Sequence, residues 1–456
     1  MIQMGLELAH SGAECYLIDL PGHGASLERF TPAASRRAVQ EVSNWILNGS
    51  SPARGCPEED LFLIGHSLGG GLAIENARKN DCASGVIAVS PASVPVSRNS
   101  PPHLLILYGE NDFPFVRRGA VFLFEEVTGI PIPFPDKPRF REDSKKTHTL
   151  VPLQWTEHSG GLFLPGAHRE IKNWINRTAQ YSSLDSENNG GAAARVILNG
   201  VLCIVGLASW FPGFSLIASG LLKQPSRLAR PMGFSSNRID RAQKLTTGFE
   251  TYGAYMLFSF VTLVMLKWFA PWDRLHLLGG GFLTGFLCLT GMALFGWRTP
   301  PVNALNSSWR GVACSVAGLL LLVLYPLALV SRYFVYLDLT SVRLWRLPII
   351  VLCTLPFFLW DEWVFRIFLS REGKWKLTNY FLSTRLILGI SLMFGFYLLK
   401  STDFLVLLLL PGLALMSLLG WMCSGWVFSK TQNCAASALF SSLCTGWIFG
   451  IFFPQF

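Results

Sequence analysis

Hydrophobic and polar residues follow two different patterns along this chain, and the pattern changes near residue 180. Before that point, short apolar runs alternate with amphipathic stretches and Gly- or Pro-containing turns, which is typical of an α/β domain. Beyond it, long apolar segments follow one another. The stretch Thr178 to Arg195 is small and polar, as in a flexible linker. We therefore predict an α/β domain over residues 1–177, a linker over 178–195 and a multi-span membrane domain over 196–456.

Eight segments of the second half are long and apolar enough to be transmembrane helices, because a bilayer core about 30 Å thick needs roughly 20 apolar helical residues. The fifth is interrupted by the charged residues Asp361, Glu362 and Arg366. The predicted spans are approximately Val196–Leu222, Tyr252–Phe269, Leu275–Trp297, Val312–Tyr336, Leu344–Leu369, Phe381–Leu399, Phe404–Met422 and Ala435–Phe453. The sequence thus predicts an all-α polytopic domain of about eight helices.

Composition and charge support this division. Half of the residues are hydrophobic, only 15% are charged, and the mean hydropathy is +0.37, whereas soluble proteins carry roughly 25% charged residues. The net charge of +9 fits basic loops of a membrane protein, and no basic stretch has the aromatic interleaving expected of a nucleic-acid-binding surface. The ten cysteines form no C-x-x-C pair, so neither a disulfide framework nor a zinc site is predicted. We expect no metal and no cofactor, and the oligomeric state is not readable.

Basic residues in the short loops indicate an orientation, since they favour the cytoplasmic side. The loop after the fifth predicted span carries Arg371, Lys374 and Lys376. The loop after the first span carries Lys223, Arg227, Arg230, Arg238, Arg241 and Lys244. With eight spans, this places the N-terminal domain on the non-cytoplasmic side. The chain begins MIQMGLELAHSGAE, where no charged n-region leads into an apolar core, so we predict no signal peptide in the sequence as written.

The first candidate for chemistry lies in the stretch LFLIGHSLGGG, residues 61–71. A strand-like apolar run meets Gly-His-Ser-Leu-Gly, and a helical stretch follows. A G-x-S-x-G pattern between a strand and a helix predicts a sharp turn that exposes a nucleophilic serine, here Ser67. We expect Gly65 and Gly69 to make room for close chain approach, and the N–H of Leu68 to be an oxyanion donor. The alternative is a plain glycine-rich turn with a solvated serine.

A serine nucleophile needs a base, and the base needs a carboxylate to orient it. Asp112 comes just after the apolar strand HLLILYG, and His158 follows another predicted strand, HTLVPLQW. Both would lie at the carboxyl edge of a parallel sheet, where such folds assemble their sites. Glu110 is an alternative acid, and His168 is an alternative base, although its place on an amphipathic helix favours partly packed surface. We expect His66 to pack beneath the turn.

Four stretches, CYLIDLPGHGAS (Cys15 to Ser26), LIGHSLGGG, LYGENDF and EHSG, resemble the α/β-hydrolase superfamily, and most closely its esterase, lipase and serine-aminopeptidase-like branch. The resemblance covers residues 1–177. It implies a doubly wound, mostly parallel sheet, with Ser67 as nucleophile, His158 as general base and Asp112 as its orienting acid. It also implies an acyl-enzyme that water resolves.

Two departures from that family stand out. The family has strands before the first helix, and a loop among them gives a second oxyanion N–H, but this chain starts within the predicted first helix, MGLELAHSG. We therefore expect the sheet to lack its first strands and the natural start to lie upstream of Met1. Between the strand after Ser67 and the strand before Asp112 there is only a short Ser- and Pro-rich loop, so no helical cap is expected.

In the second half, FFLWDEWVFRIF is similar to the E-E-x-x-x-R segment of intramembrane CAAX-type proteases. Those enzymes use further His or Asn residues on later helices, and no histidine follows His276 here. Glu362 and Arg366 are four residues apart and share one helix face, so we favour a structural ion pair.

The sequence therefore favours an integral, multi-pass membrane protein that carries a serine hydrolase for an ester, thioester or amide. Its membrane location suggests the lipid bilayer as a partner and a small acyl or lipid substrate. The alternative is a transporter or membrane receptor whose hydrolase-like domain is regulatory and inactive. Acyl transfer to an acceptor held by the membrane half is a third interpretation.

Overall fold

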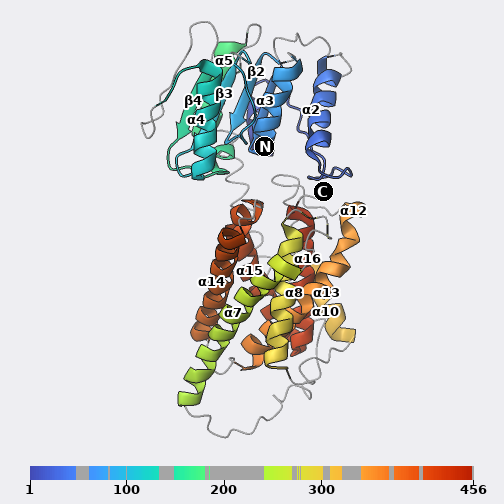
Figure 1. Ribbon diagram of the computed structural model, residues 1–456. Coiled ribbons are helices and arrows are strands. Elements are labelled where there is room, and N and C mark those ends of the chain that lie inside the picture. Colours follow the sequence, from blue (N-terminus) through green and yellow to red (C-terminus); the bar gives the residue numbers. More distant parts are fainter. Residues whose placement is uncertain are drawn as a thin grey trace. The chain divides into compact units, whose positions relative to one another are not determined.

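The computed structural model describes residues 1–47, 61–80, 83–98, 100–132, 148–179, 184, 241–269, 275, 277, 279–300, 309–320, 340–368, 374–399 and 404–453. The chain divides into two compact units, an N-terminal α/β unit and a C-terminal helical unit (Figure 1). The predicted linker, Thr178 to Arg195, lies largely outside the described residues.

A four-stranded parallel sheet forms the centre of the N-terminal unit, in the order β1-β2-β3-β4. Every neighbouring pair is parallel, so that Ile106 of β3 lies opposite Ala88 of β2 and Leu150 of β4. β2 and β3 are buried at every position, as apolar strands covered on both faces should be. The predicted α/β class with a parallel sheet is confirmed. The strands are β1 (Phe62–His66), β2 (Gly85–Val89), β3 (Leu104–Gly109) and β4 (His148–Leu153).

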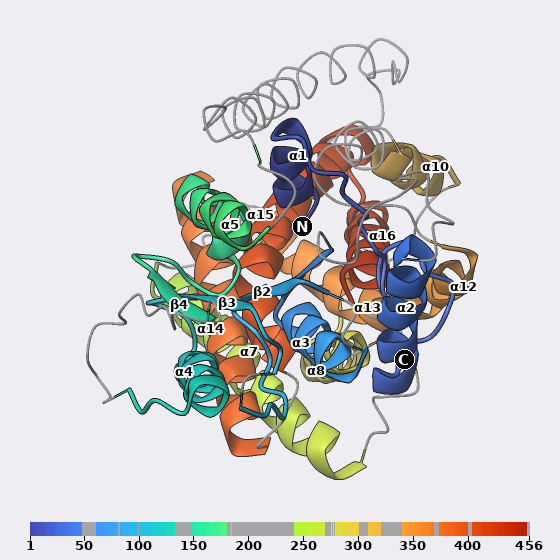
Figure 2. The same ribbon diagram turned by 90° about the horizontal axis from the view of Figure 1, so that it is seen from above.

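Helices cover both faces of this sheet (Figure 2). Helices α3 (Leu68–Asn80) and α4 (Pro114–Thr128) pack against one set of alternating residues of β2 and β3. Helices α1 (Ile2–His10) and α5 (Pro165–Thr178) pack against the other set. Because side chains alternate along a strand, each apolar strand supplies both cores. The arrangement leaves the carboxyl ends of the strands as one shared edge.

Two further elements complete the described part of this unit. Helix α2 (Pro32–Leu47) packs beside α3, and a short 3-10 turn, η2 (Gly160–Leu162), precedes α5. Between β2 and β3, the described residues form no helix. Residues 133–147, between α4 and β4, lie outside the described residues.

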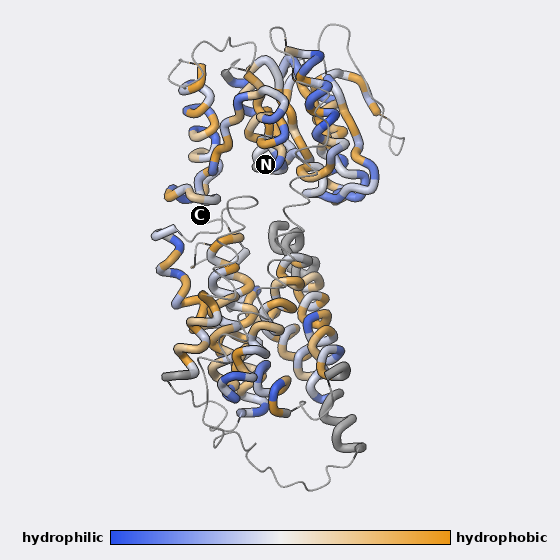
Figure 3. Tube along the Cα trace, turned by 180° about the vertical axis from the view of Figure 1, so that it is seen from behind, coloured by the Kyte–Doolittle hydropathy of each residue, from blue (hydrophilic) through white to orange (hydrophobic). Residues whose placement is uncertain are grey.

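The C-terminal unit consists of helices in its described residues. Hydrophobic residues predominate along these helices, whereas hydrophobic and hydrophilic residues alternate through the N-terminal unit (Figure 3). The helices are α7 (Arg241–Phe269), α8 (Gly280–Trp297), α10 (Trp309–Gly318), α12 (Ser341–Leu344), α13 (Arg346–Trp363), α14 (Lys374–Leu399), α15 (Phe404–Thr431) and α16 (Cys434–Phe452). A π-helical turn, η4 (Val364–Phe368), continues α13.

Five helical segments are long and apolar enough to cross a membrane: Gly280–Trp297, Arg346–Ile367, Leu377–Gly395, Gly412–Thr431 and Cys434–Phe452. They correspond to the third and to the fifth to eighth predicted spans. The charged residues at 361, 362 and 366 do not interrupt the fifth, and the seventh extends past Met422.

The other three predicted spans are not among these five. The second lies within α7, and only residues 312–320 of the fourth are described. The first, Val196–Leu222, lies outside the described residues. The number eight and the predicted side of the membrane stay predictions.

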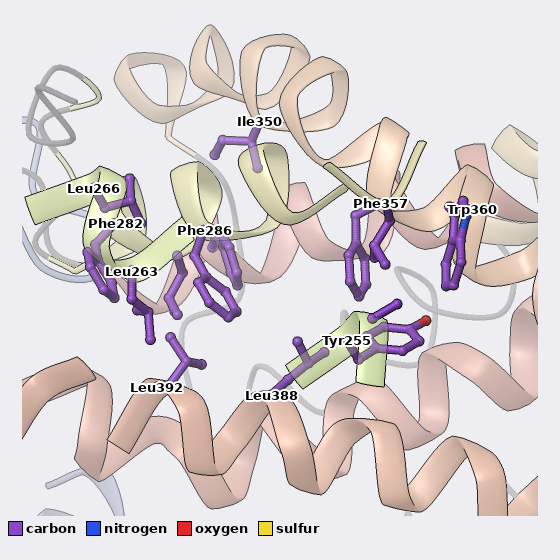
Figure 4. Close-up of a cluster of buried hydrophobic side chains, with 14 of the residues drawn as sticks. Tyr255, Leu263, Leu266, Phe282, Phe286, Ile350, Phe357, Trp360, Leu388 and Leu392 are labelled. Carbon is purple, nitrogen blue, oxygen red and sulfur yellow. The ribbon is translucent and has the colours of Figure 1, made fainter. Parts of the chain in front are cut away.

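Aromatic and leucine side chains fill the centre of the helical unit (Figure 4). They come from α7, α8, α13 and α14, and include Tyr255, Phe286, Phe357 and Leu388. Helices α8 and α13 approach closely at Gly291, where a Cβ atom would lie 2.3 Å from the backbone nitrogen of Phe357. Small residues permit such contacts between membrane helices.

Candidate active site

Ser67 occupies the turn between β1 and α3. β1 ends at His66 and α3 begins at Leu68, so the change of direction falls on a single residue. Ser67 has a φ of 52°, in the left-handed region that a non-glycine residue rarely adopts. Its backbone N–H donates to Val89 O at 2.9 Å, and its carbonyl accepts from the N–H of Ala92 at 2.8 Å. The end of β2 therefore holds this strained residue in place.

The glycines around the turn have unequal roles. A Cβ atom on Gly65 would lie 2.1 Å from the carbonyl oxygen of Gly69, so the backbone of α3 passes where a side chain would stand. The prediction that Gly69 also makes room for neighbouring chain is wrong, since a Cβ atom there would meet nothing within 4 Å. Gly70 is the second tight position, with Pro91 Cβ 3.1 Å away.

The structure brings Ser67, His158 and Asp112 together at the carboxyl edge of the sheet. His158 Nε2 lies 3.1 Å from Ser67 Oγ, and His158 Nδ1 lies 2.9 Å from Asp112 Oδ1 and 3.2 Å from Oδ2. A carboxylate accepts at Nδ1, so Nδ1 carries the hydrogen in the neutral ring and Nε2 faces the hydroxyl as an acceptor. This geometry lets the ring take a proton from the hydroxyl.

Backbone contacts between two loops set the distance from Asp112 to His158. The N–H of Glu110 donates to Leu153 O at 3.0 Å, and the N–H of Asn111 donates to Thr156 O at 2.9 Å. Gly109 permits this approach, because a Cβ atom there would lie 2.3 Å from Thr156 O. The loops that follow β3 and β4 are thereby joined side by side.

Asp112 is buried, with 3% of its surface exposed. Burial by itself would raise its pKa, but hydrogen bonds from His158, from the Ser90 side chain and from the N–H of Phe113 outweigh it and hold the pKa below the ordinary value. Asp112 is therefore a carboxylate at neutral pH. The sequence analysis did not predict the contact of Ser90 with Asp112. Its position directly after β2, at the same sheet edge, could have indicated it.

His66 lies against His158 and contacts its backbone. Its Nε2 is 2.9 Å from the carbonyl oxygen of His158, and the two rings are 4.9 Å apart at their centroids. Burial lowers the pKa of His66 to about 4, so the ring is neutral at pH 7 and Nε2–H donates to the carbonyl. His66 thus supports the loop that carries His158.

Glu110 and His168, the alternative acid and base, do not take part in this hydrogen-bonded arrangement of Ser67, His158 and Asp112. The Glu110 side chain is exposed, whereas both oxygens of Asp112 face His158. His168 is buried rather than partly exposed as predicted, since its Nε2 bonds to Leu162 O at 2.9 Å on the inner side of α5. Burial lowers the pKa of His168.

Leu68 is the first residue of α3. Its N–H belongs to the first turn, whose N–H groups have no acceptor within the helix. The helix dipole adds partial positive charge at this end. The turn therefore presents a donor beside Ser67 where a developing oxyanion would be stabilised.

Three aromatic residues lie next to Asp112 and His158 in the chain. The Phe113 ring lies 6.1 Å from the His158 ring and stacks on Phe115 at 5.8 Å. Phe115 is 58% exposed and Trp155, in the loop before His158, is 88% exposed with a φ of 57°. The described part of the chain contains no group of three or more His, Cys, Asp or Glu side chains that could hold a metal ion.

Among the described residues of the helical unit, charged side chains of α13, η4 and α14 form two ion pairs. The predicted pair of Glu362 and Arg366 is confirmed, with Arg366 Nε 3.0 Å from Glu362 Oε2. Asp361 pairs with Arg385 of α14, which the sequence reasoning did not anticipate; Nη1 lies 3.1 Å from Oδ1 and Nη2 lies 2.5 Å from Oδ2. Periodicity relates residues within one helix, so a partner on another helix carries no sequence signal.

Comparison with known proteins agrees with the fold. Residues 3–181 match the model of a family described as the alpha/beta hydrolase family. No curated protein and no solved structure matches the chain. The N-terminal unit is therefore an alpha/beta hydrolase domain with a parallel sheet, and a helical region with five apolar segments of membrane-spanning length follows it.

Proposed function

We propose that the N-terminal domain is a serine hydrolase that cleaves an ester, thioester or amide bond through an acyl-enzyme on Ser67, and that the helical unit anchors it in a membrane. The observation that carries the proposal is the continuous hydrogen-bonding geometry from Asp112 through His158 to the hydroxyl of Ser67. The match to the alpha/beta hydrolase family supports the hydrolase class.

In the first half-reaction, Ser67 Oγ attacks the substrate carbonyl while His158 Nε2 accepts its proton. Asp112 keeps the proton of Nδ1 in place and stabilises the imidazolium that forms. The oxyanion receives a hydrogen bond from the N–H of Leu68. The tetrahedral intermediate then collapses, and His158 gives the proton to the leaving alcohol, thiol or amine.

In the second half-reaction, water takes the place of the leaving group. His158 removes a proton from the water as it attacks the ester carbon of the acyl-Ser67, and returns that proton to Oγ when the acid leaves. The arrangement needs no cofactor. Because Asp112 is already ionised at neutral pH, His158 can accept and return protons at that pH while Asp112 stays a carboxylate.

The exposed apolar residues Phe115 and Trp155, with the Phe113 ring beside His158, favour an acyl group of low polarity. An apolar surface next to the nucleophile gains free energy by covering a hydrocarbon chain, at roughly 25 cal/mol per Å². A lipid or other long-chain acyl ester is therefore the substrate class that we propose.

Hydrolysis of p-nitrophenyl esters by the purified full-length protein in detergent tests the proposal. We expect turnover to rise with acyl chain length and to fall by about 10⁴ or more in Ser67→Ala. Ser97→Ala, at an exposed serine of the β2–β3 connection, is the matched control and should keep full activity. Absence of turnover by the wild type with esters, thioesters and amides would favour a regulatory domain.

Product analysis with an added acceptor alcohol separates hydrolysis from acyl transfer. Hydrolysis gives the free acid at an unchanged rate. A new ester formed in preference to the acid would reassign the second half-reaction to transfer while leaving the role of Ser67 intact.

A further inference from the structure

A large apolar cavity lies inside the helical unit. Its volume is about 640 Å³, within the range of small-molecule sites and far above the voids of ordinary packed interiors. The lining comes from α8, α13, α14, α15 and α16 and is dominated by Leu, Phe, Met and Ile side chains. A space of this size and polarity suits a hydrocarbon chain better than water.

We place the entrance to the cavity at α14 and α15, because lining residues of both helices reach the surface. The lining residues Leu386, Ile390 and Met393 of α14 and Leu415 of α15 are each more than half exposed. All four are apolar and belong to helices that contain segments of membrane-spanning length. Lipid chains of a bilayer would contact this entrance directly, so an amphiphile can enter from the membrane.

Charged side chains form one polar region of the lining. Asp361, Glu362 and Arg385 line the cavity, and Arg366 pairs with Glu362 behind it. Each cation already faces a carboxylate, so the two negative and two positive charges balance. Tyr255 donates a further hydrogen bond to Asp361, and Ser424 donates one to Glu362 at 2.5 Å.

This balance selects against a charged ligand head. A fatty-acid carboxylate would bring an additional negative charge beside Asp361 and Glu362 in an apolar surrounding, where both guanidinium groups are already engaged. A hydroxyl group adds no charge and can donate to a carboxylate oxygen. The polar region therefore suits an uncharged head group.

One polar atom at the cavity lacks a partner. Trp421 lines the cavity, and its indole Nε1–H is buried without a hydrogen-bond partner among the residues that the structure describes. Buried donors are nearly always paired, and an unpaired one calls for a ligand or solvent atom. A hydroxyl or ester oxygen would supply the acceptor.

We propose that this cavity binds one uncharged long-chain lipid, with its hydrocarbon chain among α14, α15 and α16 and its hydroxyl or ester oxygen at Asp361, Glu362 and Trp421. The π-helical turn directly after Trp363 agrees with a functional role, because π-bulges are common at such sites. The inference is independent of the reaction proposed for Ser67.

Two matched photoaffinity probes test whether the cavity binds an uncharged lipid. One is a long-chain fatty alcohol that carries a diazirine, and the other is the fatty acid of the same chain, used at mildly alkaline pH, where the acid is ionised. Neither carries a bond that Ser67 could cleave. The full-length protein in nanodiscs is irradiated with each probe, and labelled peptides are mapped. We expect the alcohol to label α14 and α15 at least about tenfold more than the acid. Equal labelling by both would overturn the uncharged class, and no labelling of these helices would overturn the site.

Two glycines allow a matched pair of variants that test whether the probe occupies the cavity. Gly389 lines the cavity, and a Cβ atom there would meet nothing within 4 Å, so Gly389→Phe fills the space without a backbone clash. Gly412 of α15 has equally free surroundings but is outside the lining. We expect Gly389→Phe to lower labelling by about tenfold and Gly412→Phe to leave it within about twofold. Equal labelling of the two variants would contradict the site.

Trp421→Phe tests the head-group position. It keeps an aromatic ring against Phe381 and Arg366 while removing the indole donor. Loss of one hydrogen bond should weaken alcohol labelling by about three- to tenfold, with the thermal unfolding midpoint preserved. Unchanged labelling would overturn the placement of the head group at Trp421.

Discussion

His158 Nε2 lies 3.1 Å from Ser67 Oγ, although the two residues are 91 positions apart in the chain. The sheet explains this contact. Ser67 follows β1, Asp112 follows β3 and His158 follows β4, and all three strands end at the same edge because every neighbouring pair is parallel. The two loops after β3 and β4 are then joined by backbone hydrogen bonds.

Replacing the orienting carboxylate should reduce catalysis without unfolding the domain. In Asp112→Asn, the amide no longer fixes the proton on Nδ1 of His158, and we expect kcat to fall by about 10⁴. The rate of p-nitrophenyl ester hydrolysis by the purified full-length protein measures this. Glu110→Gln, two residues away at an exposed side chain, is the matched control and should stay within about twofold. Equal losses in both variants would remove Asp112 from the assigned role.

The two glycines that flank Ser67 and Leu68 should respond in opposite ways to the same substitution. Gly65→Ala places a methyl group 2.1 Å from Gly69 O, so β1 and α3 must move apart. We expect this variant to lose about 2–4 kcal/mol of stability and to lose its activity. Gly69→Ala meets open space and should retain activity within a few-fold. Thermal unfolding and ester hydrolysis of both variants give the comparison; a Gly69→Ala variant as damaged as Gly65→Ala would refute the geometry of the turn.

His66 should make the stability of the N-terminal domain depend on pH. Its pKa is lowered to about 4 by burial, from an ordinary value of 6.5. Below pH 6.5 the unfolded state binds a proton at His66, whereas the folded state does not bind it until the pH approaches 4. The free energy of unfolding is therefore at its full value above pH 6.5 and decreases as the pH falls toward 4. The loss amounts to about 3 kcal/mol.

His66→Gln retains a donor for the carbonyl of His158 and does not titrate. We expect the unfolding midpoint of this variant to fall less steeply between pH 6.5 and pH 4 than that of the wild type. His168, whose pKa burial also lowers, accounts for a residual slope. Asp112 contributes only at lower pH, because its pKa lies below 3.8. Identical slopes for wild type and variant would show that His66 is not held neutral.

The ion pair of Asp361 and Arg385 joins two helices of the helical unit, and removing one partner should cost more stability than removing both. Arg385→Gln leaves a buried carboxylate facing Tyr255 without its cation, and we expect a loss of about 3–5 kcal/mol. The double variant Asp361→Asn/Arg385→Gln should recover part of it. Thermal unfolding of the four proteins in detergent forms a double-mutant cycle. Additive losses would mean that the pair is not coupled.

The meeting of Ser67, Asp112 and His158 at one sheet edge was predictable, because local sequence context decides their positions. An apolar run that ends in Gly-His-Ser-Leu-Gly specifies strand, turn and helix, and the runs before Asp112 and His158 place both at strand ends. Because parallel strands share one carboxyl edge, three such residues converge without further information.

The supporting contacts were not predictable, because they depend on which atoms approach across the fold. Ser90 bonds to Asp112 only because β2 lies between β1 and β3. Gly69 belongs to the same motif as Gly65, but only at Gly65 would a Cβ atom clash with the neighbouring backbone. In the helical unit, hydropathy predicted eight spans, of which five match segments of membrane-spanning length. It could not predict the partner of Asp361, because that partner lies on a separate helix.

Mapping of the residue that reacts with a fluorophosphonate probe tests the central claim most directly. The purified full-length protein is treated with the probe, digested, and the modified peptide is identified by mass spectrometry. The account predicts a single adduct on Ser67 that disappears in Ser67→Ala and forms far more slowly in His158→Gln. An adduct on another serine, or a wild-type protein that stays unmodified while its fold is intact, would contradict it.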